Sequence, residues 1–109
     1  MNADQVWSNI MVSLNEKPSD LPTIPSNNRI PRWFSAYIEN GDLFVKNAVN
    51  HRPSTKMSKI RKVSKKDFET VYSFYHRWAN GERYLRQEVR TLSRNTAYIF
   101  ALISRFENL

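Results

Sequence analysis

The chain contains no cysteine, and its only glycines are Gly41 and Gly81. Without cysteine it has no disulfide framework, no thiolate zinc site and no cysteine nucleophile. Two isolated glycines also exclude a Gly-rich phosphate-binding loop. The longest apolar run, residues 97–103, is too short to span a bilayer, and residues 1–14 lack the pattern of a signal peptide. These absences predict a small cytoplasmic protein with no membrane contact.

Side chains that bind metals or transfer protons are also sparse. His51 and His76 are the only histidines, and neither belongs to a His-x-x-x-His pair. The carboxylates Glu39 and Asp42 are more typical of a solvated turn than of a cation site. We therefore expect no metal, no cofactor and no enzymatic activity. One catalytic alternative stays open, because a histidine pair beside Lys or Arg can cleave RNA by general acid–base chemistry.

Acidic residues are outnumbered, with 10 Asp and Glu against 17 Lys and Arg among 109 residues. The net charge is +7, and residues 51–66 contain no acid at all. Such a block repels itself unless an anionic surface neutralises it. It is therefore either a solvated basic loop or a contact for a phosphate backbone. Its seven cations are Arg52, Lys56, Lys59, Arg61, Lys62, Lys65 and Lys66.

A single domain over residues 1–109 is expected to begin with a helix over residues 1–14. Apolar residues recur there at helical spacing, and Asn2 with Gln5 forms a capping-box pattern. Four prolines prevent a helix in residues 15–31, so this segment is expected to be an extended connector.

A β-hairpin is predicted over residues 32–49. Asn40-Gly41 supplies the positive φ angles that a two-residue hairpin turn requires. This register places Ile38 opposite Leu43 on one face of the hairpin and Tyr37 beside Phe44 on the other. The hairpin aromatics either fill the core or stack on unpaired bases. They are Trp33, Phe34, Tyr37 and Phe44.

A basic stretch over residues 50–66 leads into a helical part over residues 64–109. Ser64 and Asp67 form a capping-box pattern, and Asn80-Gly81 ends the helix that follows. Two more helices are predicted over residues 82–91 and 94–107. The fold class is therefore α+β, with an N-terminal helix, one hairpin and three C-terminal helices. The last two of these form a helix-turn-helix-like pair.

The first helix of this pair carries three cations at i, i+3 and i+7. We expect Leu92 on its buried edge, together with Leu85 and Val89. The opposite side is either a solvated face with Glu82 and Glu88 as partners or a phosphate contact. Its cations are Arg83, Arg86 and Arg90.

The second helix of the pair begins with Ser93-Arg94-Asn95-Thr96-Ala97-Tyr98. This segment resembles the start of the recognition helix in helix-turn-helix DNA-binding proteins. The chain from Trp33 onward also resembles small proteins of phages and mobile elements from Gram-positive bacteria. These share an Asn-Gly hairpin, a basic stretch and a C-terminal pattern of the type carried here by Arg86, Glu88, Thr91, Asn95 and Tyr98. The resemblance implies an exposed first turn in which Arg94 reads guanine and Asn95 reads adenine.

We therefore predict a non-enzymatic protein that binds double-stranded DNA, as a small regulator or accessory protein of a phage or mobile element. Arg94, Asn95 and Tyr98 are the predicted groove contacts. The predicted backbone contacts are Lys56, Lys59, Arg61, Lys62, Lys65, Lys66, Arg83, Arg86 and Arg90.

The apolar surface of residues 99–106 and of the N-terminal helix suggests a homodimer. Two alternative functions stay open. One is a module that binds an acidic protein partner, for example as an inhibitor of a host system. The other is an RNA binder, or a ribonuclease that uses His51 and His76.

Overall fold

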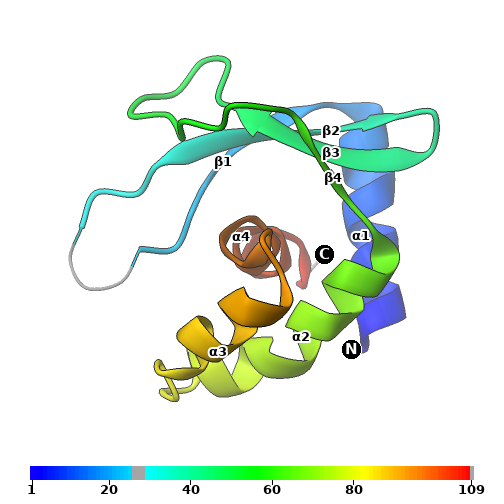
Figure 1. The fold of residues 1–109 in the computed structure, drawn as a ribbon. Helices are drawn as coiled ribbons and strands as arrows, with labels where there is room; N and C mark the ends of the chain where they lie inside the picture. The colour runs from blue at the N-terminus through cyan, green and yellow to red at the C-terminus, as the bar shows by residue number, and fades with distance from the viewer. Residues whose placement is uncertain (26–28, 109) are drawn as a thin grey trace.

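The computed structural model describes residues 1–25 and 29–108 and shows a sheet with helices packed on one of its faces (Figure 1). The antiparallel sheet has the order β1-β2-β3-β4. Its strands are β1 (Ser19–Pro22), β2 (Trp33–Glu39), β3 (Asp42–Asn47) and β4 (Arg61–Val63). The helices are α1 (Ala3–Glu16), α2 (Lys65–Ala79), α3 (Leu85–Leu92) and α4 (Thr96–Phe106). None of the helices in the described ranges is long and apolar enough to cross a membrane.

The N-terminal helix and its cap are confirmed. The Asn2 side chain accepts a hydrogen bond from the Gln5 backbone N–H at 2.9 Å, and the Gln5 side chain accepts one from the Asn2 N–H at 2.9 Å. Val6, Ile10 and Leu14 are buried along one stripe of α1. This stripe fixes α1 against the sheet and α2, because an amphipathic helix is stabilised mainly by burial of its apolar face.

The predicted hairpin is confirmed with its register, which pairs Ile38 with Leu43. Asn40 and Gly41 have φ angles of 52° and 80°, as the two-residue turn requires. Two short strands, β1 and β4, extend the hairpin on either side. Residues 15–31 were predicted as an extended connector, and within them β1 pairs with β2 as a short strand. Its pairing was missed because prolines stand at both ends of this segment, although Pro22 is tolerated at the end of an edge strand.

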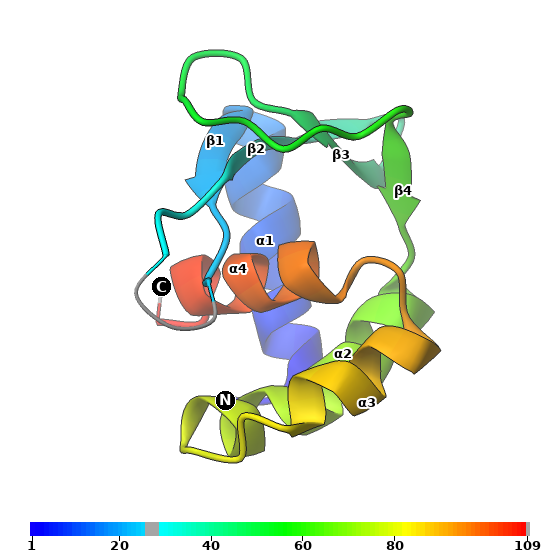
Figure 2. The same ribbon diagram turned by 60° about the vertical axis from the view of Figure 1, so that its left-hand side comes forward.

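Helix α4 forms the centre of the core and lies between the sheet and the α2–α3 pair (Figure 2). The Phe100 ring of α4 stacks on the Trp78 ring of α2, with 4.4 Å between the two ring centroids. The part of the suggested dimer surface that residues 99–106 form is therefore largely buried within one chain. Its buried residues are Ile99, Phe100, Ala101, Leu102, Ile103 and Phe106.

The capping of α2 links this helix to the α3–α4 turn. Ser64 Oγ accepts from the Asp67 backbone N–H at 3.0 Å, as predicted. The Asp67 carboxylate, however, accepts a hydrogen bond from Asn95 Nδ2 at 3.0 Å. Gly81 has a φ of 121° just after the end of α2. Leu92 is 58% exposed, so its predicted burial is wrong: it is the last residue of α3 and lies at the rim of a hollow.

Candidate anion-binding site

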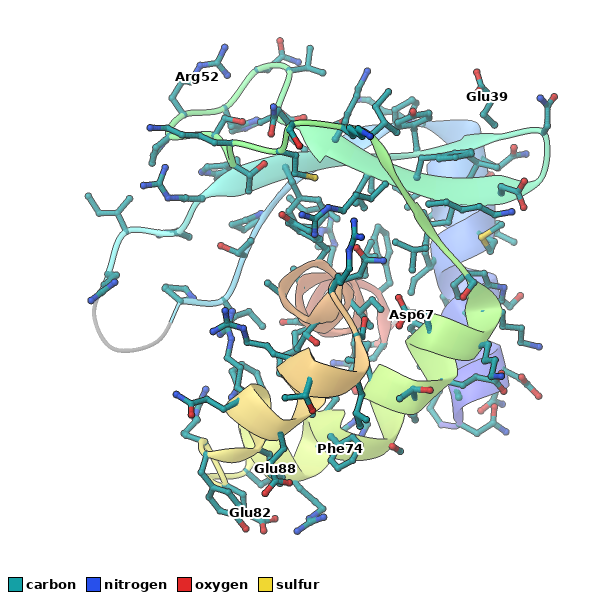
Figure 3. The ribbon with its side chains drawn as sticks, in the orientation of Figure 1. Glu39, Arg52, Asp67, Phe74, Glu82 and Glu88 are labelled. Carbon is teal, nitrogen blue, oxygen red and sulfur yellow. The ribbon has the colours of Figure 1, made fainter. Side chains whose placement is uncertain are left out.

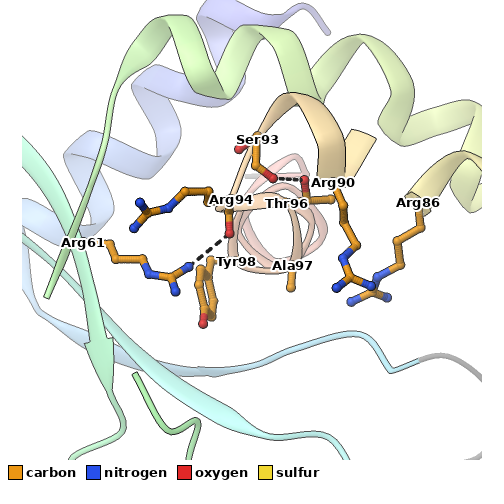
Figure 4. Close-up of a pocket in the computed structure, with 8 residues that line it drawn as sticks. All are labelled: Arg61, Arg86, Arg90, Ser93, Arg94, Thr96, Ala97 and Tyr98. Atoms are coloured by element: carbon orange, nitrogen blue, oxygen red, sulfur yellow. Dashed lines mark hydrogen bonds between the residues drawn. The ribbon is translucent and has the colours of Figure 1, made fainter. Parts of the chain in front are cut away.

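Four arginines from three parts of the chain line one cavity of about 370 Å³. Its floor is the start of α4, where Ala97 and Tyr98 lie between two arginine pairs (Figure 4). We call this space the arginine cavity. Among the residues that the structure describes, none that lines it is acidic. The four arginines are Arg61 of β4, Arg86 and Arg90 of α3, and Arg94 of the α3–α4 turn.

Arg61 reaches the arginine cavity because side chains alternate along β4. Lys62 lies opposite Phe44 on the outer face of the sheet, so Arg61 faces the helices. The Arg61 Nη1 donates a hydrogen bond to the backbone oxygen of Arg94 at 3.1 Å (Figure 4). Its guanidinium carbon lies 5.6 Å from the ring centre of Tyr98. These contacts fix the side chain, and within the described residues Nη1 is the one donor of its guanidinium group with a hydrogen-bond partner.

Arg86 is the most buried of the four arginines, and backbone and ring contacts hold its side chain. Its Nη1 donates to the backbone oxygen of Ile24 at 2.6 Å, and its guanidinium lies 5.7 Å from the ring centre of Trp78. Arg83 lies over the same ring at 4.5 Å. Burial, followed by the charges of Arg90 and Arg83, lowers the pKa of Arg86 below its ordinary value. Arginine nevertheless stays protonated, so the chain holds several positive charges close together at this point.

The acidic side chains form their ion pairs elsewhere in the described chain. Glu82 was an expected partner of the α3 arginines, but its carboxylate accepts hydrogen bonds from Arg77 Nε and Nη2, each at 3.0 Å. No ion pair of Glu88 occurs within residues 1–25 and 29–108. Figure 3 shows both carboxylates at the outer edge of α3. Arg83 and Arg90 are exposed, as the solvated-face interpretation predicts, but within the described residues Glu82 and Glu88 form no ion pair with the α3 arginines.

Two further hollows continue the arginine cavity in both directions. One is lined by Arg83 together with Arg86 and Arg90, and it shares these last two with the cavity. The other is lined by Lys59 and Lys62 and shares Arg61 and Arg94 with it. Asp67 is the one acid that lines these three hollows, and Asn95 engages its carboxylate. We call the whole surface the basic groove, formed by Lys59, Arg61, Lys62, Arg83, Arg86, Arg90 and Arg94.

Other predicted cations do not line the basic groove. Lys65 Nζ pairs with Asp4 of α1 at 3.0 Å, and Lys56 and Lys66 are exposed outside the three hollows. Arg52 lies on the loop beyond the far end of the sheet (Figure 3). Within the groove, Lys62 is partly neutralised, because its Nζ lies 3.5 Å from Asp42. The acid-free block of residues 51–66 is therefore divided between several surfaces.

Asn95 cannot read a base, and this prediction is wrong. Its Nδ2 donates to the Asp67 carboxylate at 3.0 Å and to the backbone oxygen of Lys62 at 3.4 Å. The residue is only 8% exposed. A short turn does join α3 to α4, but the apolar run Ile99–Ile103 draws α4 into the core. A helix buried in this way cannot enter a major groove. Arg94 is exposed and Tyr98 is half-buried, and both line the arginine cavity.

The two histidines lie in different layers of the molecule. His51 is on the loop that follows β3, where its ring stacks on Trp33 at 4.0 Å. His76 is on α2, and its Nε2 lies 2.9 Å from Glu107. They do not form a common acid–base site. Within the described ranges, no three His, Asp or Glu side chains gather in the way that a metal ion requires.

A second cluster of donors surrounds Asp20 of β1. Its carboxylate accepts from the backbone N–H groups of Val49, Asn50 and His51 at 3.1, 2.7 and 3.1 Å, and it lies 3.0 Å from His51 Nδ1. The side chain is only 4% exposed. Burial alone would raise the pKa of Asp20, but hydrogen bonds from the His51 ring and these amides lower it to about 2. Sequence reasoning missed this cluster because its members have no regular spacing.

The arginine cavity can thus hold an anion, while the Asp20 cluster already contains one. Arginine guanidinium groups donate paired hydrogen bonds to phosphate or carboxylate oxygens. The floor of the cavity adds the first turn of α4, whose backbone N–H groups have no partner within the helix. Comparison of the chain with protein-family models, with curated proteins and with solved structures gave no match.

Proposed function

We propose that this protein binds nucleic acid without catalysing a reaction, and that it holds the phosphate backbone of DNA in the basic groove. The observation that carries this proposal is the convergence of Arg61, Arg86, Arg90 and Arg94 on one cavity with no acid among its lining residues. Such a concentration of like charge is unfavourable in isolation and favours binding of an anion. Phosphate oxygens match the fork of the guanidinium group.

The length of the basic groove favours a polyanion over a single small anion. Its three hollows share arginines, so the positive charge continues on both sides of the arginine cavity. A nucleic-acid backbone presents phosphates in a row, whereas a small metabolite would engage only the centre. Backbone contacts fix position but carry no sequence information. Because Asn95 is buried, we expect weak discrimination between base sequences.

This binding mode fits a small regulatory or accessory protein, which is the role that the resemblance to phage and mobile-element proteins implies. Such a protein would coat or bridge DNA and would not select one operator. Base readout by α4 is not part of the proposal.

The test is fluorescence anisotropy of a labelled duplex of random sequence over a range of salt concentrations. Each phosphate contacted along the groove contributes about −0.9 to the slope of log K against log salt, so contact with several phosphates predicts a steep linear fall. Arg90→Ala should reduce this slope by about 1, equally for different sequences. The matched control is Arg105→Ala, an exposed arginine at the other end of α4, which should leave the slope unchanged. Wild-type slope and affinity in Arg90→Ala would refute the proposal.

An acidic protein partner is a second candidate, favoured by apolar side chains beside the groove. Ile60 is 56% exposed and Leu92 is 58% exposed, and both line the same hollow as Arg61 and Arg94. A partner held mainly by burial of these side chains would show little salt dependence, whereas backbone binding depends steeply on salt. The salt titration therefore separates the two candidates.

A further inference from the structure

We propose that the arginine cavity takes the terminal phosphate monoester of a nucleic-acid strand in preference to an internal phosphodiester. This inference rests on the proposed function, since it names the part of a nucleic acid that enters the deepest section of the groove.

The arrangement of the arginines matches the oxygens of a monoester. Arg61 and Arg94 lie on one side of the first turn of α4, and Arg86 and Arg90 lie on the other (Figure 4). An internal phosphodiester has one negative charge and two non-bridging oxygens, so it satisfies one arginine pair well. A terminal monoester carries a charge of about −1.5 to −2 and three acceptor oxygens, which serve both pairs together.

The shape of the site also favours a strand end. The arginine cavity is recessed between α3 and β4, with Ala97 and Tyr98 as its floor. A continuous backbone has to enter and leave a recess, whereas a terminal phosphate only has to enter it. The adjoining hollows then hold the backbone of the same strand.

Two of the four arginines of the cavity are held in place by contacts within the protein. Arg61 is fixed by the backbone oxygen of Arg94, and Arg86 is fixed by the backbone oxygen of Ile24 and by Trp78. Burial and the charges of Arg90 and Arg83 lower the pKa of Arg86, so a dianion there removes more repulsion than a monoanion does. Donors that are already ordered lose less conformational entropy on binding.

The experiment compares one labelled strand in three forms: with a terminal phosphate at the 5′ end, with one at the 3′ end, and with hydroxyls at both ends. We expect at least one phosphorylated form to bind about tenfold more tightly than the hydroxyl form. Arg90→Lys and Arg94→Lys keep the charge but lose the guanidinium fork. Each should abolish this preference, so that the phosphorylated and the hydroxyl forms bind the variant with equal affinity. Arg105→Lys is the control and should keep the preference.

The outcomes separate this inference from the proposed function. Equal affinity for all three forms, with salt-dependent binding intact, overturns the inference alone. Failure of the wild-type protein to bind any form overturns both. Tighter binding of a phosphoserine peptide than of a phosphorylated strand overturns the assignment to nucleic acid in favour of a phosphoprotein. Circular dichroism of each variant checks that the fold is retained.

Discussion

Two clusters of hydrogen-bond donors differ in whether the chain itself supplies the anion that they surround. Around Asp20, three backbone amides and the His51 ring converge on a carboxylate of the chain itself. In the arginine cavity, four guanidinium groups converge and no lining residue is acidic. The first cluster closes a loop onto the sheet, and the second stays open.

The difference separates donors that stabilise the fold from donors that bind a ligand. Buried or crowded donors are normally satisfied, because an unsatisfied one costs free energy. In the Asp20 cluster a carboxylate of the chain itself accepts from the donors, so its removal should lower the free energy of unfolding. In the arginine cavity an external anion has to satisfy the donors, so substitution of these arginines should change ligand binding.

The largest effect is expected when carboxylates are placed in the open cluster. Arg90→Glu combined with Arg94→Glu should lower affinity for duplex DNA about 1,000-fold. The double variant loses two guanidinium groups, and its two new carboxylates can pair with Arg61 and Arg86. Anisotropy at low salt measures this loss, and Arg105→Glu is the matched control. Retention of affinity by the double variant would show that the cavity is not the binding site.

Removal of the anion from the closed cluster should act on stability. Asp20→Ala leaves three loop amides without their acceptor and should lower the free energy of unfolding by about 3 kcal/mol. Urea denaturation measures this change, with Asp42→Ala, an aspartate with an accessible side chain, as the control. DNA affinity of the folded variant should equal that of the wild type. A loss of affinity comparable to that of the arginine variants would contradict the division between the clusters.

Acid should weaken the closed cluster in a defined pH window. Because the pKa of Asp20 is lowered from 3.8 to about 2 in the folded chain, its charged form stabilises the fold above pH 4. That stabilisation, about 2 kcal/mol, should disappear as the pH falls from about 4 to about 2. Urea titrations at several pH values test this for the wild type and for Asp20→Asn, which should lack this component. An identical pH dependence in the two proteins would show that Asp20 is not responsible.

The smallest effect is expected at the apolar rim of the groove. Leu92→Ser removes an exposed side chain and should change the free energy of unfolding by less than about 0.5 kcal/mol. DNA affinity should also stay constant, since phosphates gain nothing from Leu92. A marked loss of DNA binding in this variant would favour an interface built on apolar burial, as the acidic-partner alternative requires.

The sequence allowed prediction of the elements that local rules determine. The Asn2 cap, the Ser64 cap and the Asn40-Gly41 turn each depend on a few neighbouring residues, and all three are confirmed. The strands β1 and β4 escaped prediction because they are short and depend on pairing with the hairpin. Pairing between distant segments leaves no periodic signal in so few residues.

The candidate site was predicted in part, and the errors have a common cause. The arginines of α3 and Arg94 were identified by their type and spacing, and they do line the cavity. Asn95 was assigned to base readout because the local motif places it in a first helical turn. Burial of α4 instead turns this side chain toward Asp67. Arg61 was also predicted as a backbone contact, but its place in the cavity depends on the pairing of β4 with β3, which no local pattern indicates.

The most direct measurement is an NMR titration of the arginine Nε–Hε signals with a short duplex at low salt. The account predicts that the signals of Arg61, Arg86, Arg90 and Arg94 shift together and saturate at one affinity. The signals of Arg77 and Arg105, which lie outside the groove, should stay in place. Shifts spread evenly over all arginines, or confined to those outside the cavity, would contradict the claim that an open donor cluster is the binding site.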